Sequence, residues 1–255
     1  MNIGISRPTT TIEETCHMLE TAARCGFEGV QLKPSQYFLT DLSKEPFQQA
    51  YAEQAVLVRG GLIFYVGSDI ENWRDVIEPT LGFAAEIEAG HVCVCGGVSR
   101  GVGGEAEARQ RRAAQVLNEI GQTANEKGLR ISLHNHANSL FETVADLDFM
   151  VENLNPEYCG LTLDTAHFAK IGVEDVAALV HRYNKVILNV HLKDMDAQGN
   201  FCPLGTGTIE LDRVLNALAE MDYDEWLIVD EESREFETEE AFDISRDFLS
   251  AKGLM

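Results

Sequence analysis

The sequence has few basic residues and no long apolar run. Its 255 residues include 20 Lys and Arg against 42 Asp and Glu, which gives a formal net charge of -22. Nucleic-acid binding depends on basic side chains that neutralise phosphates, so DNA and RNA are not expected partners. No segment approaches the roughly 20 apolar residues of a membrane span. Residues 1–6 also lack the basic and then apolar pattern of a signal peptide. We therefore expect a cytoplasmic protein with no membrane partner.

Cysteine is scarce, and its spacing is not that of a paired C-x-x-C motif. The six cysteines are Cys16, Cys25, Cys93, Cys95, Cys159 and Cys202. Buried, reduced thiols are the expectation for such a set. Hydrophobic residues make up 45% of the chain and charged residues 24%, as in folded globular proteins. No low-complexity segment or linker divides the chain, so we predict one domain over residues 1–255.

Short apolar runs alternate with longer stretches of helical periodicity. Residues 11–25 and 105–127 have apolar side chains at helical spacing, and Gly128 follows the second stretch as a helix C-terminal glycine. Strands that are apolar on both faces and separated by helices pair in parallel under a layer of helices. A single (β/α)8 TIM barrel fits this pattern best. The eight expected strands are Asn2–Ser6, Gly29–Leu32, Leu62–Gly67, His91–Cys95, Arg130–His134, Gly160–Asp164, Val186–His191 and Trp226–Asp230.

Four of these strands end in titratable side chains. Such groups seldom lie at the end of a buried strand unless they pair or bind a metal. The carboxyl ends of barrel strands open on one rim, and alternate residues face inward together. The expected inward sets are His134 with His136, Thr162 with Asp164, His191 with Lys193, and Asp230 with Glu232. One shared site is therefore predicted.

Each group also has a simpler interpretation. A single histidine beside an apolar strand is more often a structural residue than a ligand. Asp164 could cap the following helix together with Thr165. His191 and Lys193 could be solvated rim residues. Because all of them occur together at the correct strand ends, the shared site is the better interpretation.

The same residues resemble the xylose-isomerase-like sugar phosphate isomerase/epimerase superfamily, which also contains inosose dehydratases and ketose 3-epimerases. The resemblance is carried by residues 134–136 with 141–142, residues 163–167, residues 191–194 with 205–207, and residues 223–226. It implies a divalent metal ion held by Glu142, Asp164, His191 and Asp230. Two departures stand out. His134 occupies a position where many members have Glu, and Asp230 replaces the final Glu, so that Glu232 is an alternative fourth ligand.

The chemistry of this set can be argued from the residue types. Three carboxylates and one imidazole suit Mn²⁺ best, with Mg²⁺, Co²⁺ and Zn²⁺ as alternatives. Such an ion stabilises an enediolate as a Lewis acid and makes the neighbouring C–H acidic. His134 and His136 are candidate bases. The remaining roles are oxyanion neutralisation by Lys193, a substrate hydroxyl contact or Asp164 orientation by His167, and proton abstraction by Glu232 if neither histidine serves.

The residues that bind the substrate are harder to identify from the sequence than the metal ligands. Arg7, Lys33 and Arg100 follow strands and could bind a substrate anion. The glycine-rich residues 96–104 could cradle a phosphate or form a rim loop.

The predicted function is a metal-dependent isomerase or epimerase of a keto sugar, sugar phosphate or cyclitol. A dehydratase of the inosose dehydratase type is the alternative enzyme, and a catalytically weak partner subunit is the alternative class. The sequence is compatible with a homo-oligomer.

Overall fold

Eight parallel strands form the centre of the protein in the order β2-β1-β10-β7-β6-β5-β4-β3. The structure is a computed structural model that describes residues 1–100 and 104–255. The strands are β1 (Asn2–Ser6), β2 (Gly29–Val30), β3 (Leu62–Val66), β4 (His91–Gly96), β5 (Arg130–His134), β6 (Cys159–Asp164), β7 (Ile187–Leu192) and β10 (Trp226–Asp230). All eight predicted strands are confirmed, and so is the single TIM barrel.

The barrel closes between β2 and β3 through one short bridge. Leu32 pairs in parallel with Leu62. The Leu32 N–H donates to the Gly61 carbonyl at 3.1 Å, and the Ile63 N–H donates to the Leu32 carbonyl at 2.7 Å. This weaker seam completes the ring of strands.

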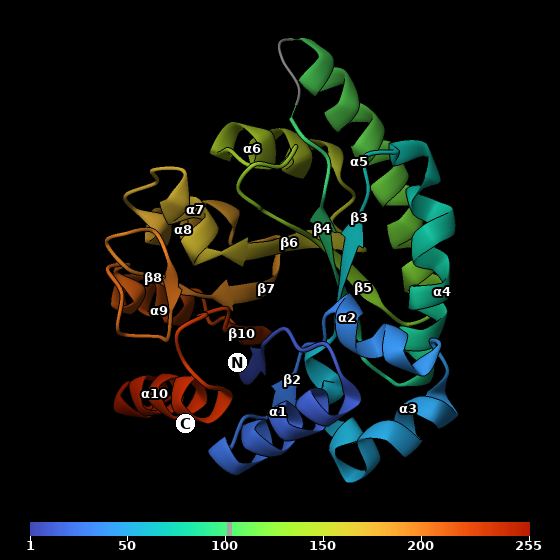
Figure 1. The fold of residues 1–255 in the computed structure, drawn as a ribbon. Coiled ribbons are helices and arrows are strands. Elements are labelled where there is room, and N and C mark those ends of the chain that lie inside the picture. Colours follow the sequence, from blue (N-terminus) through green and yellow to red (C-terminus); the bar gives the residue numbers. More distant parts are fainter. Residues whose placement is uncertain (101–103) are drawn as a thin grey trace.

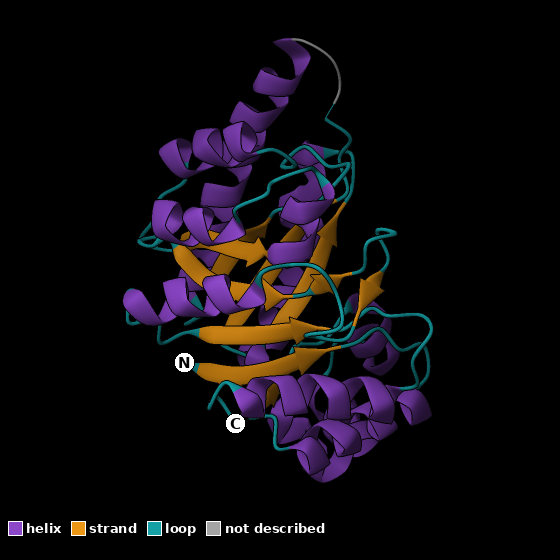
Figure 2. Ribbon diagram, turned by 90° about the vertical axis from the view of Figure 1, so that its left-hand side faces the viewer, coloured by secondary structure: helices purple, strands orange, loops and turns teal. Residues whose placement is uncertain are grey.

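Helices surround the strands on the outside, as Figure 2 shows. They are α1 (Ile12–Cys25), α2 (Pro34–Tyr37), α3 (Lys44–Tyr51), α4 (Trp73–Glu86), α5 (Gly104–Glu126), α6 (Val144–Asn153), α7 (Thr165–Lys170), α8 (Val176–Tyr183), α9 (Leu211–Glu220) and α10 (Thr238–Ala251). Short 3-10 helices span Phe38–Thr40, Ala52–Gly60 and Ile70–Asn72. After β7 the chain forms a small hairpin, β8 (Asp194–Met195) with β9 (Phe201–Cys202). Among the described residues, no helix combines the length and apolar character required to cross a membrane.

Local sequence signals set the helix ends. The Thr11 side chain accepts the Glu14 N–H at the start of α1, and Gly26 follows α1 with a φ of 84°. Gly128 takes a φ of 76° just after α5, as predicted. The last helix returns to the first: α10 lies beside α1 (Figure 1), where Arg24 pairs with Asp243 at 3.0 Å.

The core lies mainly between the strands and the helices. Alternate strand residues point outward into one large apolar cluster, among them Ile5, Val94 and Leu163. Inside the barrel, Ile63, Cys93 and Cys95 form a separate small apolar cluster. All six cysteines are free thiols, as expected, but only four are buried, since Cys16 and Cys202 are partly exposed. The other side chains inside the barrel are largely polar. Burying polar groups costs free energy, so these side chains indicate a functional site at the barrel mouth.

Candidate active site

The carboxyl ends of the strands enclose a cavity of about 20 Å³, room for about one water molecule or an ion. Strand alternation places the predicted pairs His134 with His136 and Asp230 with Glu232 on its wall. The complete lining is Lys33, Ile63, Tyr65, Cys95, His134, His136, His167, His191, Asp230 and Glu232. The structure therefore brings together side chains from strands that are far apart in the sequence.

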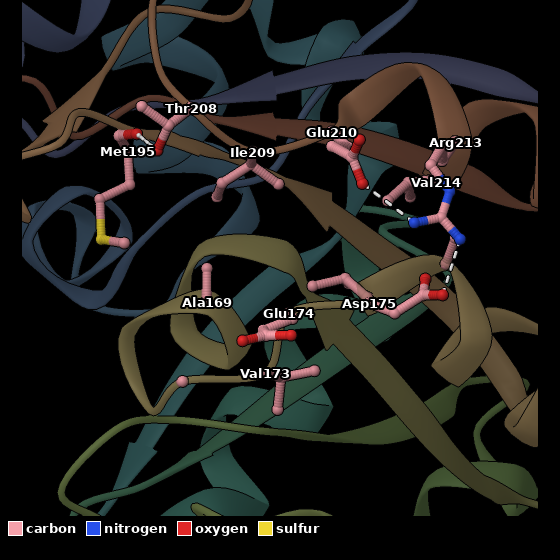
Figure 3. Close-up of a pocket in the computed structure, with 13 residues that line it drawn as sticks. Ala169, Val173, Glu174, Asp175, Met195, Thr208, Ile209, Glu210, Arg213 and Val214 are labelled. Atoms are coloured by element: carbon pink, nitrogen blue, oxygen red, sulfur yellow. Dashed lines mark hydrogen bonds and ion pairs between the residues drawn. The ribbon is translucent and has the colours of Figure 1, made fainter.

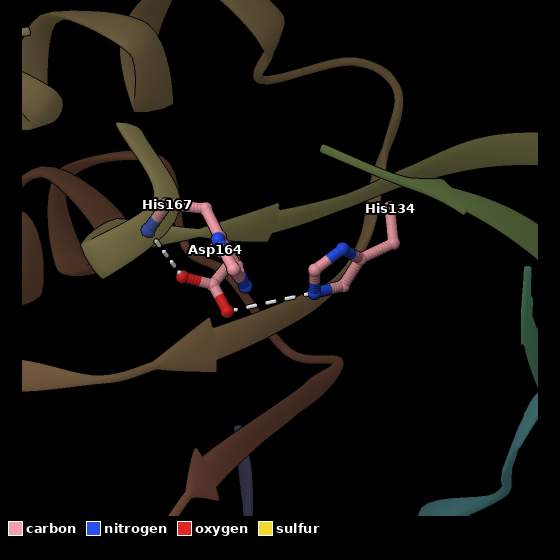
Figure 4. A group of neighbouring side chains, drawn as sticks. All are labelled: His134, Asp164 and His167. Atoms are coloured by element: carbon pink, nitrogen blue, oxygen red, sulfur yellow. Dashed lines mark hydrogen bonds and ion pairs between the residues drawn. The ribbon is translucent and has the colours of Figure 1, made fainter. Parts of the chain in front are cut away.

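The two oxygens of Asp164 have different surroundings. Oδ1 accepts the backbone N–H of His167 at 2.9 Å and caps α7, so the simpler helix-cap interpretation holds for this oxygen. Oδ2 is buried and has no hydrogen-bond partner. Its nearest nitrogens are His134 Nε2 at 3.5 Å (Figure 4) and His191 Nδ1 at 3.8 Å. A buried carboxylate oxygen without a donor calls for a cation.

A chain of hydrogen bonds fixes the tautomer of His191. The Gln31 amide nitrogen donates to the Gly60 carbonyl at 2.8 Å, which turns its oxygen toward His191 Nε2 at 2.7 Å. Nε2 must therefore carry the proton, so Nδ1 keeps a lone pair, which accepts the His134 Nε2–H at 3.0 Å. Burial lowers the pKa of His191 to about 3, so the ring is neutral. A metal-binding histidine must be neutral, and its other ring nitrogen is held by a hydrogen-bond partner. His191 meets both conditions.

His134 faces the same point. Its Nε2 lies 3.0 Å from His191 Nδ1, and its Nδ1 lies 3.8 Å from the Cys95 sulfur. Two overlapping groups bring ligand atoms within 4.8 Å of one another: His134, Asp164 and His167, and Asp164, His191 and Asp230. The residues present fit a divalent ion, because an unpartnered carboxylate oxygen and imidazole nitrogens converge there. The donor set is richer in nitrogen than the sequence suggested.

Two lysines and two carboxylates form a closed ring beside these imidazoles. Lys33 Nζ lies 2.9 Å from Asp230 Oδ1 and 2.7 Å from Glu232 Oε1. Lys193 Nζ lies 2.9 Å from Asp230 Oδ2 and 2.5 Å from Glu232 Oε2. Burial alone would lower the pKa values of both lysines, but the two carboxylates raise them above the ordinary value. Both ammonium groups are therefore charged.

His136 and His167 differ in the protonation of the same ring atom, Nε2. The His136 Nδ1–H donates to the Ala137 carbonyl at 2.8 Å, so Nε2 carries a lone pair. Burial lowers the pKa of His136, which keeps this ring neutral. His167 Nδ1 accepts the Ala137 N–H at 3.4 Å, so its proton is on Nε2. Burial lowers the pKa of His167 to about 2. The Nε2 atom of His136 is therefore a hydrogen-bond acceptor, and the Nε2–H of His167 is a donor.

Some predicted residues lie outside this cluster. Arg7 donates to Glu231 at 3.3 Å and to the carbonyls of Ser233 and Phe236, so it ties the loop after β10 to β1. The Glu142 carboxylate accepts the Asn138 N–H at 2.9 Å within its own loop and does not line the cavity.

Arg100 pairs with Asp146 at 3.0 Å and does not line the cavity. The glycine-rich stretch 96–104 lies in part outside the described residues.

Sequence reasoning missed several residues of the site. Gln31 directly follows β2 and lies two residues before Lys33, and this inward alternation was a signal that pointed to it. Tyr65, on β3, also lines the cavity and is 49% exposed. Phe201 lies on the β8–β9 hairpin, with Lys193 Nζ 4.0 Å from its ring centre. No sequence pattern placed that hairpin over the barrel mouth.

Larger cavities flank the mouth. One of about 550 Å³ lies between the β8–β9 hairpin and the loop after β10, and one of about 400 Å³ lies beside it. Phe201 and Glu232 line both. The rim between β8 and α9 is held by buried Asp194, whose carboxylate accepts the N–H groups of Gly205 at 3.0 Å and Gly207 at 2.9 Å. A side chain at Gly207 would collide with that carboxylate.

Figure 3 shows a separate cavity of about 330 Å³. It is lined by residues around α7, α8 and the start of α9. Arg213 spans part of its wall by pairing with Asp175 at 2.6 Å and with Glu210 at 2.9 Å. None of the predicted site residues lines it.

Sequence comparison relates the chain to sugar enzymes. The chain is 30% identical over 139 residues to an inosose dehydratase of Bacillus cereus, a match that covers 48% of this chain and 46% of that protein. It is 31% identical over 137 residues to an inosose dehydratase of Clostridium tetani, covering 47% of this chain and 46% of that protein. The matches therefore span about half the length of these curated relatives.

Solved structures share the fold along nearly the whole chain. A D-tagatose 3-epimerase-like protein has a TM-score of 0.76 at 20% identity, with 100% of this chain and 98% of that chain covered. The 3-keto-D-glucoside 4-epimerase of E. coli has a TM-score of 0.77 at 19% identity, covering 98% of this chain and 99% of the other. A family model described as xylose isomerase-like TIM barrel matches residues 19–252. The chain belongs to the xylose isomerase-like TIM barrel family.

Proposed function

We propose that the protein is a divalent-metal-dependent isomerase or epimerase that removes a proton next to the carbonyl of a keto sugar, sugar phosphate or cyclitol. The observation that carries this proposal is the buried Asp164 Oδ2, which has no donor and faces His134 and His191 at 3.5 and 3.8 Å. Asp164, His191, His134 and Asp230 are the proposed ligands. A bound ion would supply Lewis-acid polarisation of a carbonyl.

Asp230 is included because its Oδ2 lies 3.8 Å from His191 Nδ1. Two carboxylates with two imidazoles still suit Mn²⁺, and the extra nitrogen favours Co²⁺ and Zn²⁺ over Mg²⁺ as alternatives. The sequence-based ligand Glu142 is replaced in this proposal by His134, because its carboxylate is engaged in its own loop.

The histidines at the cavity supply the proton chemistry in this proposal. His136 offers the lone pair of Nε2 as the base, because Nδ1–H is held by the Ala137 carbonyl. His167 offers Nε2–H to a substrate oxygen, because its Nδ1 faces the Ala137 N–H. Lys193 keeps a permanent positive charge near the carbonyl oxygen, where negative charge develops. Phe201 covers Lys193 and limits water access to it.

The alternative function is a dehydratase, which uses the same proton abstraction and then expels a β-hydroxyl group. The roughly 30% identity to inosose dehydratases over half the chain favours it. Incubating the protein with keto sugars and inososes in deuterated water, with NMR detection, separates the two. Loss of the C–H signal with retention of all hydroxyl carbons supports an isomerase or epimerase, and formation of a new dione or alkene supports a dehydratase.

Elemental analysis of the purified protein tests the metal requirement. Near-stoichiometric Mn, Co or Zn is expected. A protein that holds none, and that gains no thermal stability on addition of Mn²⁺, would be a partner subunit rather than an enzyme.

A further inference from the structure

The ring of Lys33, Lys193, Asp230 and Glu232 has two carboxylates that play the same geometric role. Each carboxylate spans both ammonium groups, with one oxygen on each, at 2.5 to 2.9 Å. The two lysine side chains are 5% and 2% exposed. Burying four charges seldom adds stability over well-packed apolar residues. Their position at the mouth of an active-site cavity indicates a binding role.

The two carboxylates differ in how they are held. Asp230 is the last residue of β10, and its side chain is 4% exposed. Glu232 lies in the loop after β10, and its side chain is 26% exposed. Glu232 lines the central cavity of about 20 Å³ and both rim cavities, of about 550 and 400 Å³. It therefore borders both rim cavities and the central cavity, which is also lined by His134, His191 and Asp230.

The developing oxyanion of a neutral ketose accounts for one ammonium group, that of Lys193, but not for a second one beside it. If Glu232 swings outward, Lys33 and Lys193 keep one carboxylate, Asp230, and the ring gains one unit of positive charge. That excess attracts a single negative group with two oxygens on one side. Arg7 does not compete for this role, since it is bound to Glu231 and to backbone carbonyls.

We propose that Lys33 and Lys193 bind the anionic end of the substrate, which replaces the Glu232 carboxylate between the two ammonium groups. A carboxylate fits this exchange best, because it repeats the planar two-oxygen geometry of Glu232 and the central cavity leaves room for about one more water-sized group. The substrate class is then a keto sugar acid rather than a neutral ketose or cyclitol. The inference rests on the proposed function in taking the barrel mouth as the substrate site.

Three six-carbon polyols that differ in one end group test the proposal. Calorimetry would compare D-glucitol, D-gluconate and D-glucitol 1-phosphate, which differ at C1, on the purified protein and on the same protein treated with EDTA. Gluconate is expected to bind at least about tenfold more tightly than glucitol in both. If the phosphate binds tightly and gluconate binds no more tightly than glucitol, the lysines form an anion site for a phosphate rather than a carboxylate. Equal affinity for all three, or no binding of either anion, overturns the proposal.

A second experiment measures the same binding on the variant Glu232→Gln. Removing the competing charge is expected to tighten gluconate binding about tenfold and to leave glucitol unchanged. Glu235→Gln is the matched control, because Glu235 lines the same 550 Å³ cavity without pairing with either lysine. It is expected to change gluconate binding less than about threefold. If Glu232→Gln binds gluconate no more tightly than Glu235→Gln does, Glu232 is not the displaced group and the proposal fails.

The two proposals fail in different ways. Anion binding after EDTA treatment depends on the lysines and not on a divalent ion. A protein that prefers gluconate but exchanges no substrate hydrogen with solvent refutes the proposed isomerase and leaves the anion site standing. A protein that exchanges hydrogen on neutral sugars and shows no anion preference refutes the lysine site alone. Should Glu232→Gln fail to fold, the comparison of the three polyols on the unaltered protein still decides.

Discussion

Replacing Gln31 with Met should weaken metal binding through its effect on His191. Gln31 makes two buried hydrogen bonds, to the Gly60 carbonyl at 2.8 Å and from His191 Nε2 at 2.7 Å. Met has nearly the same length and makes neither. The Nε2–H is then left without an acceptor, and the ring loses the contact that holds Nδ1 toward Asp164. A hydrogen-bond partner on the ring nitrogen that does not bind the metal raises the metal affinity roughly 10- to 100-fold.

The same change should lower stability in the absence of metal. Two buried polar groups lose their partners, at about 1–3 kcal/mol each, and the apolar Met offsets a part, so we expect a loss of about 2–4 kcal/mol in the free energy of unfolding. Gln110→Met is the matched control. Gln110 is also buried, and it donates to the Leu140 carbonyl and to Asp146 on the outside of the barrel. It should lose comparable stability and keep full metal affinity.

Three measurements check this reasoning. Calorimetric titration with Mn²⁺ gives the affinity, and urea unfolding of EDTA-treated protein gives the stability. Nitrogen NMR of the histidine rings gives the tautomer, which should be Nε2–H for His191 in the unaltered protein and mixed in Gln31→Met. If Gln31→Met binds Mn²⁺ within about threefold of the unaltered protein, or if Gln110→Met loses as much affinity, the hydrogen-bond chain does not position a ligand.

Four further substitutions address the ligands, the base and acid stability. His134→Ala should remove bound metal while Glu142→Gln keeps it, as read by elemental analysis; the opposite result restores the ligand implied by the sequence. His136→Gln should lower turnover by roughly 100-fold or more at unchanged metal content, and undiminished solvent exchange would exclude His136 as the base. Burial lowers the pKa of His91 to about 3, against about 6.5 in an unfolded chain. The unfolded state therefore binds more protons as the pH falls below about 6.5, and this histidine alone should cost about 2 kcal/mol of stability at pH 5. Urea unfolding of His91→Gln should show a correspondingly smaller loss between pH 7 and pH 5, and an identical pH dependence would contradict the shift.

The sequence by itself determined the barrel and the location of the site. Strands such as Arg130–His134 and Trp226–Asp230 are found with the predicted bounds, because an apolar run with polar residues at its end has few other ways to bury its surface. The rim followed from chain direction, since the carboxyl ends of parallel strands meet on one side. Side-chain alternation then identified which residues face inward.

Only the tertiary structure decided which atoms meet. Lys33 and Glu232 are 199 positions apart, and Gln31 and His191 are 160 apart. Their contacts depend on the order of strands around the barrel and on the stagger between neighbours, which no local pattern encodes. The choice of His134 over Glu142 in the cluster has the same origin. His134 ends a strand whose position the barrel fixes, whereas Glu142 lies in a loop whose path is set by its own hydrogen bonds, such as that from the Asn138 N–H.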